Sequence, residues 1–114
     1  MEKHKRIYNK LVRDLVPEAI VCNGDECVHY IIEDDNAFIE ALDEKLDEEL
    51  VEYQISKDLS KLADVLEVIH AIANARGSSF EELDKLRVEK RKLRGGFSKR
   101  FLIEEIHEYK KRDL

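Results

Sequence analysis

Four acidic residues on two predicted helices are the residues of this chain most able to do chemistry: Glu48, Glu49, Glu52 and Asp64. At about 100° per residue, Glu49 lies in the middle of an apolar helix face, Glu52 follows at its edge and Glu48 lies on its rim. Asp64 interrupts an apolar face of the next predicted helix in the same way. A carboxylate within an apolar face is unfavourable unless a partner offsets its charge. The pattern therefore predicts that these acids share a partner.

A divalent cation is the partner that these residue types favour. Two helices joined by a short turn pack antiparallel and bring their acids together, where bare carboxylates repel one another and some must take up protons. A hard cation that prefers oxygen ligands removes this conflict. We therefore predict a Mg²⁺ site, with Mn²⁺ as a second candidate ion and with Glu67, one turn after Asp64, close to it. The alternative is that these glutamates form a solvated helix face, as most acidic runs do.

The composition indicates one globular domain, residues 1–114, with 40% charged and 43% hydrophobic residues. The net charge of -6 argues against general nucleic-acid binding. The charge is unevenly distributed, because acids dominate residues 33–58 and basic residues dominate residues 85–100. An acidic centre beside a basic flank suits a metal-bound polyphosphate, whose oxygens the basic groups can meet.

The amino-terminal residues are charged, and no stretch approaches the roughly 18 apolar residues that would span a membrane. We therefore expect a soluble, cytoplasmic protein that has no membrane partner. The chain has two cysteines, Cys22 and Cys27, which do not make a secreted disulfide framework. They flank the turn signal Asn23-Gly24, and free thiols are favoured over a bridge between them. The same turn signal is compatible with a short β-hairpin near residues 20–32.

The rest of the chain is mainly α-helical. A short helix is expected around residues 15–20, with Pro17 in its first turn. A long helix capped by Asp34 or Asp35 should run to about Ile55. The next helix runs from Leu59 to about Arg76, and Gly77 ends it. Ser79 and Glu82 then form a capping box for a helix that runs from Phe80 to about Leu93.

The helix that begins at Leu59 is apolar nearly all round, and one neighbouring helix cannot cover it. We therefore predict a homodimer, or a tetramer, in which two helical hairpins form a four-helix bundle.

Three motifs resemble a known family. The acids Glu48-Glu49-x-x-Glu52 and Asp64 resemble the paired acidic motif of the MazG-like, all-α nucleoside triphosphate pyrophosphatase superfamily. The segments 8–14, 62–69 and 94–100, in this order, are similar to its small branch often labelled phosphoribosyl-ATP pyrophosphohydrolase-like, and the resemblance extends over residues 7 to about 103. The resemblance implies an all-α dimer or tetramer that uses Mg²⁺ to hydrolyse a nucleoside triphosphate or related nucleotide and release pyrophosphate.

Roles for individual residues follow from the same resemblance. It implies that the metal is bound by Glu49, Glu52 and Asp64, with Glu48 as a candidate additional ligand. If Glu48 does not bind the metal, its carboxylate is a candidate to orient or deprotonate the attacking water. The chain differs from the family pattern at Lys61, where an acid usually stands. Either Glu67 replaces the missing ligand, or Lys61 itself meets a phosphate. Basic residues of the first and last motifs would contact the phosphates of the substrate: Lys10, Arg13, Arg94, Lys99 and Arg100.

Two functions are therefore expected from the sequence. The first is a nucleotide pyrophosphohydrolase, with removal of unwanted nucleotides from the cellular pool as its role. The alternative is a catalytically impaired module of the same fold that binds nucleotide or metal without turnover, as Lys61 would favour.

Overall fold

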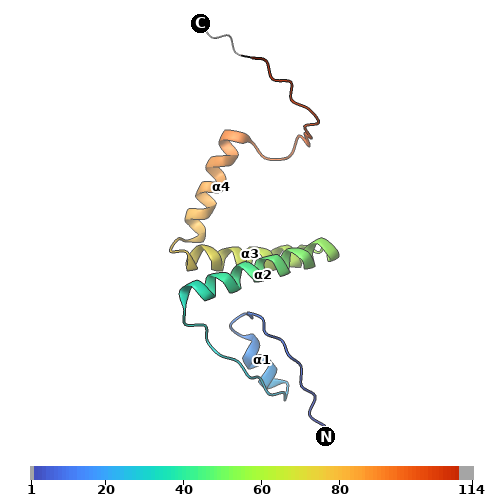
Figure 1. Ribbon diagram of the computed structural model, residues 1–114, viewed down its shortest axis with the longest axis vertical. Coiled ribbons are helices and arrows are strands. Elements are labelled where there is room, and N and C mark those ends of the chain that lie inside the picture. The colour runs from blue at the N-terminus through green and yellow to red at the C-terminus, as the bar shows by residue number, and fades with distance from the viewer. Residues whose placement is uncertain (1, 111–114) are drawn as a thin grey trace.

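The computed structural model describes residues 2–110, and it contains four helices and no strand in that part of the chain (Figure 1). The helices are α1 (Val16–Cys22), α2 (Asp35–Ser56), α3 (Leu59–Ala75) and α4 (Phe80–Arg94). The prediction of a mainly α-helical chain is confirmed. The domain predicted over residues 1–114 includes Met1 and residues 111–114, which lie outside the described residues.

Helices α2 and α3 form an antiparallel hairpin, the part of the fold that positions the candidate site (Figure 1). α2 begins where the Asp34 carboxylate accepts a hydrogen bond from the backbone N–H of Ala37, at 2.9 Å. It ends at Lys57, which adopts a left-handed conformation (φ 60°) and donates its N–H to the carbonyl of Tyr53. Because α3 starts two residues later, the helices must run side by side in opposite directions.

Helix α4 follows α3 after a short turn and contacts α3 but no other described helix. Gly77 provides the left-handed residue of this turn (φ 81°). The Ser79 hydroxyl caps α4 by accepting the N–H of Glu82, whereas the Glu82 carboxylate accepts a hydrogen bond from the Ser78 hydroxyl. One hydrogen bond of the predicted capping box is therefore formed, the one from the Glu82 N–H to the Ser79 hydroxyl. In place of the second, the Glu82 carboxylate accepts from the hydroxyl of Ser78.

The β-hairpin expected near residues 20–32 is wrong. Its first strand lies instead in α1, and residues 25–34 have no regular structure. The Asn23-Gly24 turn ends this helix, because the N–H of Asn23 donates to the carbonyl of Ala19 and that of Gly24 to the carbonyl of Val21. Asn-Gly is a signal for a change of chain direction, and a helix end satisfies it as well as a hairpin does.

Few side chains are fully covered in the single chain. Among the described residues, the buried apolar ones are Leu42, Val65, Val68 and Ala73, each at most 8% exposed. The radius of gyration is 21.2 Å, against about 13 Å for a compact chain of about 100 residues. The segment before α1 runs from one end of the molecule up to the hairpin, and the segment after α4 leads away from the hairpin toward the opposite end (Figure 1). The chain therefore contains the predicted helical hairpin, and one copy alone does not form a four-helix bundle.

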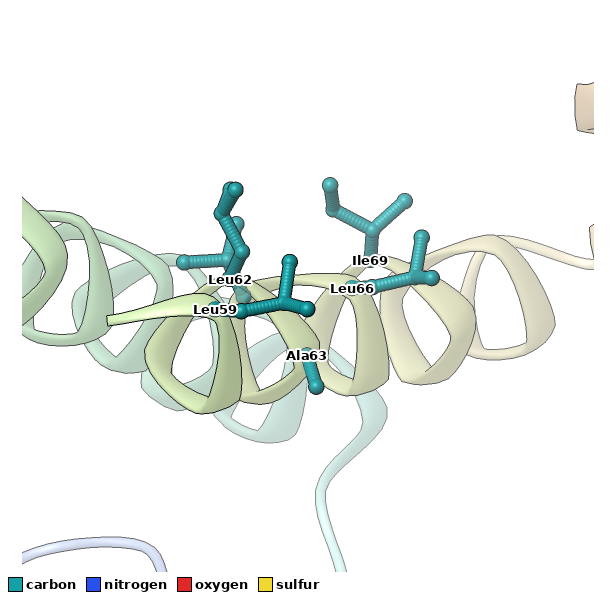
Figure 2. A pocket seen from close by; sticks show the side chains of 6 residues that line it. Leu59, Leu62, Ala63, Leu66 and Ile69 are labelled. Atoms are coloured by element: carbon teal, nitrogen blue, oxygen red, sulfur yellow. The ribbon is translucent and has the colours of Figure 1, made fainter. Parts of the chain in front are cut away.

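One side of α3 carries an uncovered apolar surface (Figure 2). Leu59 is 82% exposed, and the side chains of Leu62 and Leu66 are exposed beside it. With Ala63, Val65 and Ile69 they line a shallow apolar pocket. Within residues 2–110, no helix has the length and apolar character needed to cross a membrane.

Candidate metal centre

Three carboxylates of α2 form a compact set of oxygen donors. Glu48, Glu49 and Glu52 each offer one oxygen atom, and these atoms all lie within 4.8 Å of one another. Their positions bring this about, because Glu52 stands three residues after Glu49 and four after Glu48, and residues at these spacings are neighbours on a helix surface. Negatively charged oxygens so close together are the donor set that Mg²⁺ and Mn²⁺ prefer.

Glu49 is the buried member of the set and has an unsatisfied acceptor. The residue is only 9% exposed, as its position on the apolar face of α2 predicts. Its Oε1 atom lies 3.5 Å from Lys45 Nζ, one turn earlier on the same helix. Its Oε2 atom is buried and accepts no hydrogen bond. Because buried polar atoms nearly always have a partner, this oxygen is available as an acceptor, and the three carboxylates could hold a metal ion.

Burial also changes the protonation of Glu49. The pKa of Glu49 is raised, first because burial disfavours its charged form and then because the negative charge of Glu52 lies close to it. Lys45 opposes this shift, and Asp64 adds to it. The charges of α2 and α3 therefore act on one another, as the sequence predicts for two acidic helices packed as a hairpin.

Lys61 connects the acids of the two helices. Its Nζ atom donates a hydrogen bond to Glu52 Oε2 at 3.2 Å and lies 3.8 Å from Asp64 Oδ2. This hydrogen bond lowers the pKa of the Glu52 carboxyl and raises the pKa of the Lys61 ammonium group. Both groups are thus held in their charged forms. Asp64 does not belong to the compact set on α2, but both Asp64 and Glu52 lie beside the ammonium group of Lys61.

Two basic residues from the segment before α1 reach the same acids. Lys10 Nζ lies 3.4 Å from Glu48 Oε1, and an Arg13 guanidinium N–H donates to Asp64 Oδ1 at 2.7 Å. These pairs join residues that are 38 and 51 positions apart in the sequence. The first predicted phosphate-binding motif therefore lies beside both acidic helices.

The acids and bases of the site balance in number. Four carboxylates are contacted by four basic side chains, from Lys10, Arg13, Lys45 and Lys61. The side chains of Lys10 and Arg13 are 49% and 58% exposed. Ion pairs this exposed contribute only about 0–1 kcal/mol each, so an incoming charged group can displace them at little cost.

The other predicted site residues do not belong to the compact set of carboxylates. Glu67 is exposed on α3, one turn after Asp64, and is not in the compact set of carboxylates. Arg94 ends α4, and Lys99 and Arg100 follow in the segment that leads away from the hairpin (Figure 1). In the described part of the chain, none of these basic residues forms an ion pair with the acids of α2 or α3.

Sequence reasoning missed Lys45 as a residue of the site. The spacing could have identified it. Lys45 stands three residues before Glu48 and four before Glu49, so it lies on their side of α2. Comparisons of the chain with protein families, with curated proteins and with solved structures find no match.

Proposed function

We propose that this protein is a Mg²⁺-dependent nucleotide pyrophosphohydrolase, which hydrolyses a nucleoside triphosphate or a related nucleotide and releases pyrophosphate. The observation that carries the proposal is the meeting of two opposite kinds of side chain in one place. The carboxylates of α2 and α3 are suited to a divalent cation, and Lys10 and Arg13, from a distant segment, are suited to phosphate oxygens. The activity is the one implied by the family that the sequence motifs resemble.

The chemistry of the donor set fits Mg²⁺. Glu48, Glu49 and Glu52 supply closely spaced carboxylate oxygens, and the buried Oε2 atom of Glu49 lacks a hydrogen-bond partner. In this proposal Glu49, Glu52 and Asp64 hold the ion, with Glu67 as a further candidate ligand. A bound Mg²⁺ would polarise phosphate oxygens and lower the pKa of water.

The protein's own groups would perform the remaining tasks. Glu48 is half-buried at the edge of the cluster, where its carboxylate can accept a proton from the attacking water. Lys10 and Arg13 are paired with acids in the free protein. When a nucleotide arrives with its cation, the acids would take the cation, and these two bases would turn to the phosphates. This exchange leaves each of these charged groups beside an opposite charge, and it places positive charge where the leaving pyrophosphate gains negative charge.

A second candidate function has a specific observation in its favour. Lys61 lies between Glu52 and Asp64, so an ammonium group stands where two helices would otherwise present a pair of free carboxylates to a metal. A protein of this kind would bind nucleotide or metal without turnover. It would be stabilised against heat by nucleotide, and no product would be formed.

We also infer that the active form is a homodimer or a tetramer. The apolar side of α3 is exposed in one copy, and too few side chains are buried to make a typical core (Figure 2). Packing this side against α3 of a second copy would pair two hairpins into a four-helix bundle and cover the leucines.

The test is release of pyrophosphate from a panel of nucleoside triphosphates, with Mg²⁺ or Mn²⁺ and with EDTA. We expect activity that needs the cation and that falls about 100-fold or more in Glu49→Gln and in Asp64→Asn. Asp43→Asn is the matched control, because Asp43 is an exposed acid of α2 outside the cluster. Unchanged activity in both site variants would remove this centre from the reaction. Binding of nucleotide without release of pyrophosphate would favour the non-catalytic module.

A further inference from the structure

Lys61 occupies the position of a bridging cation between the two helices of the hairpin. Its Nζ atom lies 3.2 Å from a carboxylate oxygen of Glu52, on α2, and 3.8 Å from one of Asp64, on α3. All three side chains are partly exposed, between 34% and 41%, so solvent ions can reach them. Nothing in the spacing of the sequence requires this contact, since Glu52 and Lys61 stand on different helices nine residues apart.

We propose that Lys61 is a tethered cation that holds Glu52 and Asp64 together in place of a metal ion. This changes the ligand set of the proposed function in one respect. A divalent cation would bind at the α2 cluster of Glu48, Glu49 and Glu52, and Asp64 would be held by Lys61 instead of coordinating the ion. Lys61 would also keep a further ion from binding between the helices. Lys61 is a positioning residue in this scheme. This inference rests on the proposed function, because that proposal places a metal ion beside Lys61. The contacts of Lys61 with Glu52 and Asp64 are present whether or not the protein is an enzyme.

Lys45 provides the contrast that makes the inference testable. Its Nζ atom also contacts two carboxylates, those of Glu48 and Glu49, at 3.4 and 3.5 Å. Both belong to α2, the helix that carries Lys45, so removing this lysine unlinks no helices. Lys45→Met and Lys61→Met each remove one positive charge that contacts two carboxylates. Only the charge of Lys61 joins α2 to α3.

Arg13 is the other base on Asp64, at 2.7 Å, and it approaches from the segment before α1. The described ion pairs place it on Asp64 and not on Glu52. Once Lys61 is removed, Glu52 loses its only ion pair in the described part of the chain. The carboxylates of Glu52 and Asp64 then lack a shared counter-charge. A divalent ion that binds between them would stabilise the folded hairpin, because only the folded state brings the two carboxylates together.

The experiment is thermal unfolding of the full chain in EDTA and in millimolar Mg²⁺, for wild type, Lys61→Met, Lys45→Met and Lys61→Arg. We expect Lys61→Met to unfold at a lower temperature than wild type in EDTA. We expect Mg²⁺ to raise its Tm by about 5 °C more than it raises that of wild type or Lys45→Met. Lys61→Arg keeps a tethered cation and should respond to Mg²⁺ as wild type does.

Each of the other outcomes also supports or overturns the inference. Equal Mg²⁺ responses in Lys61→Met and Lys45→Met would show a general effect of charge and overturn it. If Lys61→Met does not fold in EDTA, Mg²⁺ is added to the unfolded variant. Recovery of the folded state would support the inference that Lys61 takes the place of a metal ion, and failure to recover would contradict it. The readout uses the metal alone and no nucleotide. A wild type that releases no pyrophosphate would therefore defeat the proposed function without affecting the conclusion about Lys61.

Discussion

At the scale of single residues, Glu49 is the carboxylate that the fold stabilises least in the absence of a cation. It is 9% exposed, and one of its oxygens has no hydrogen-bond partner. Glu49→Gln removes the buried charge at nearly the same volume. We expect this variant to be more stable than wild type in EDTA at neutral pH, by about 1 kcal/mol, because the cost of burying the charge exceeds the attraction of Lys45.

The sign of the pH dependence follows from the pKa shifts. The pKa of Glu49 is raised in the folded protein, so its contribution to stability is fully present below the unfolded pKa and is lost as pH rises through the raised value. The pKa of Glu52 is lowered, so its contribution is present above the unfolded pKa and is lost as pH falls through the lowered value. Thermal unfolding in EDTA should therefore show the advantage of Glu49→Gln growing from acid to neutral pH. A constant difference, or a less stable variant, would contradict this account.

Part of the site was predictable at this scale and part was not. Glu49 was identifiable because an acid on an apolar helix face is unusual whatever surrounds it, and it is the buried acid of the structure. The contacts of Lys61 were not identifiable, because they depend on the packing of α2 against α3 and on side-chain rotamers. Spacing in a sequence determines which residues share a face of one helix, and it does not determine which atoms meet across two helices.

At the scale of elements, the ends of the helices could be predicted where a capping residue forms a local hydrogen bond. The predicted starts at residues 59 and 80 agree with the structure, and of the two predicted caps of α2, Asp34 and Asp35, the structure has Asp34. The predicted ends of α2, α3 and α4 differ by one residue. Asp34, the left-handed Lys57 and Ser79 provide the local contacts that define these bounds. The β-hairpin failed for the opposite reason, because the Asn23-Gly24 turn signal does not state whether a helix or a strand precedes it.

The cap of α4 is a contact whose loss should be measurable. The Ser79 hydroxyl accepts the N–H of Glu82 at 3.1 Å, and this N–H has no partner within the helix. Ser79→Ala should lower stability by about 1 kcal/mol, which corresponds to a Tm lower by roughly 4–8 °C in a small domain. Ser98→Ala is the control, since Ser98 lies in the exposed segment after α4. A Tm of Ser79→Ala that equals the control would show that α4 adds nothing to the cooperative fold.

At the scale of the whole molecule, the extended shape of one copy leaves apolar surface that a second copy can cover. Leu62 and Leu66 are 40% and 46% exposed on the open side of α3 (Figure 2). If this side is the interface, the double variant Leu62→Gln with Leu66→Gln should be monomeric in sedimentation equilibrium at a concentration where wild type is a dimer or a tetramer. Val28→Gln, at a fully exposed position outside the helices, should leave the assembly unchanged. A monomeric wild type would rule out the predicted bundle.

In such an assembly, basic residues that are distant from the acids of their own chain could contact the acidic centre of a second copy. Arg94, Lys99 and Arg100 are carried away from the hairpin by α4 and the segment that follows it (Figure 1). If they contact the phosphates of the substrate as predicted, they would do so at the acidic centre of a second copy. We therefore expect that a variant with all three changed to Gln is inactive alone and that Glu49→Gln is inactive alone.

Mixing these two inactive variants under conditions that exchange subunits should restore activity. In a dimer, half of the randomly mixed molecules combine one copy of each variant, and each of these has one centre with intact acids and intact partner bases. About a quarter of the wild-type activity should therefore return. Glu49→Gln mixed with Asp64→Asn is the control and should stay inactive, because every centre then lacks one acid. Full activity in the triple Gln variant alone would show that the basic segment has no part in the reaction. Loss of activity without recovery on mixing would place its role within its own chain.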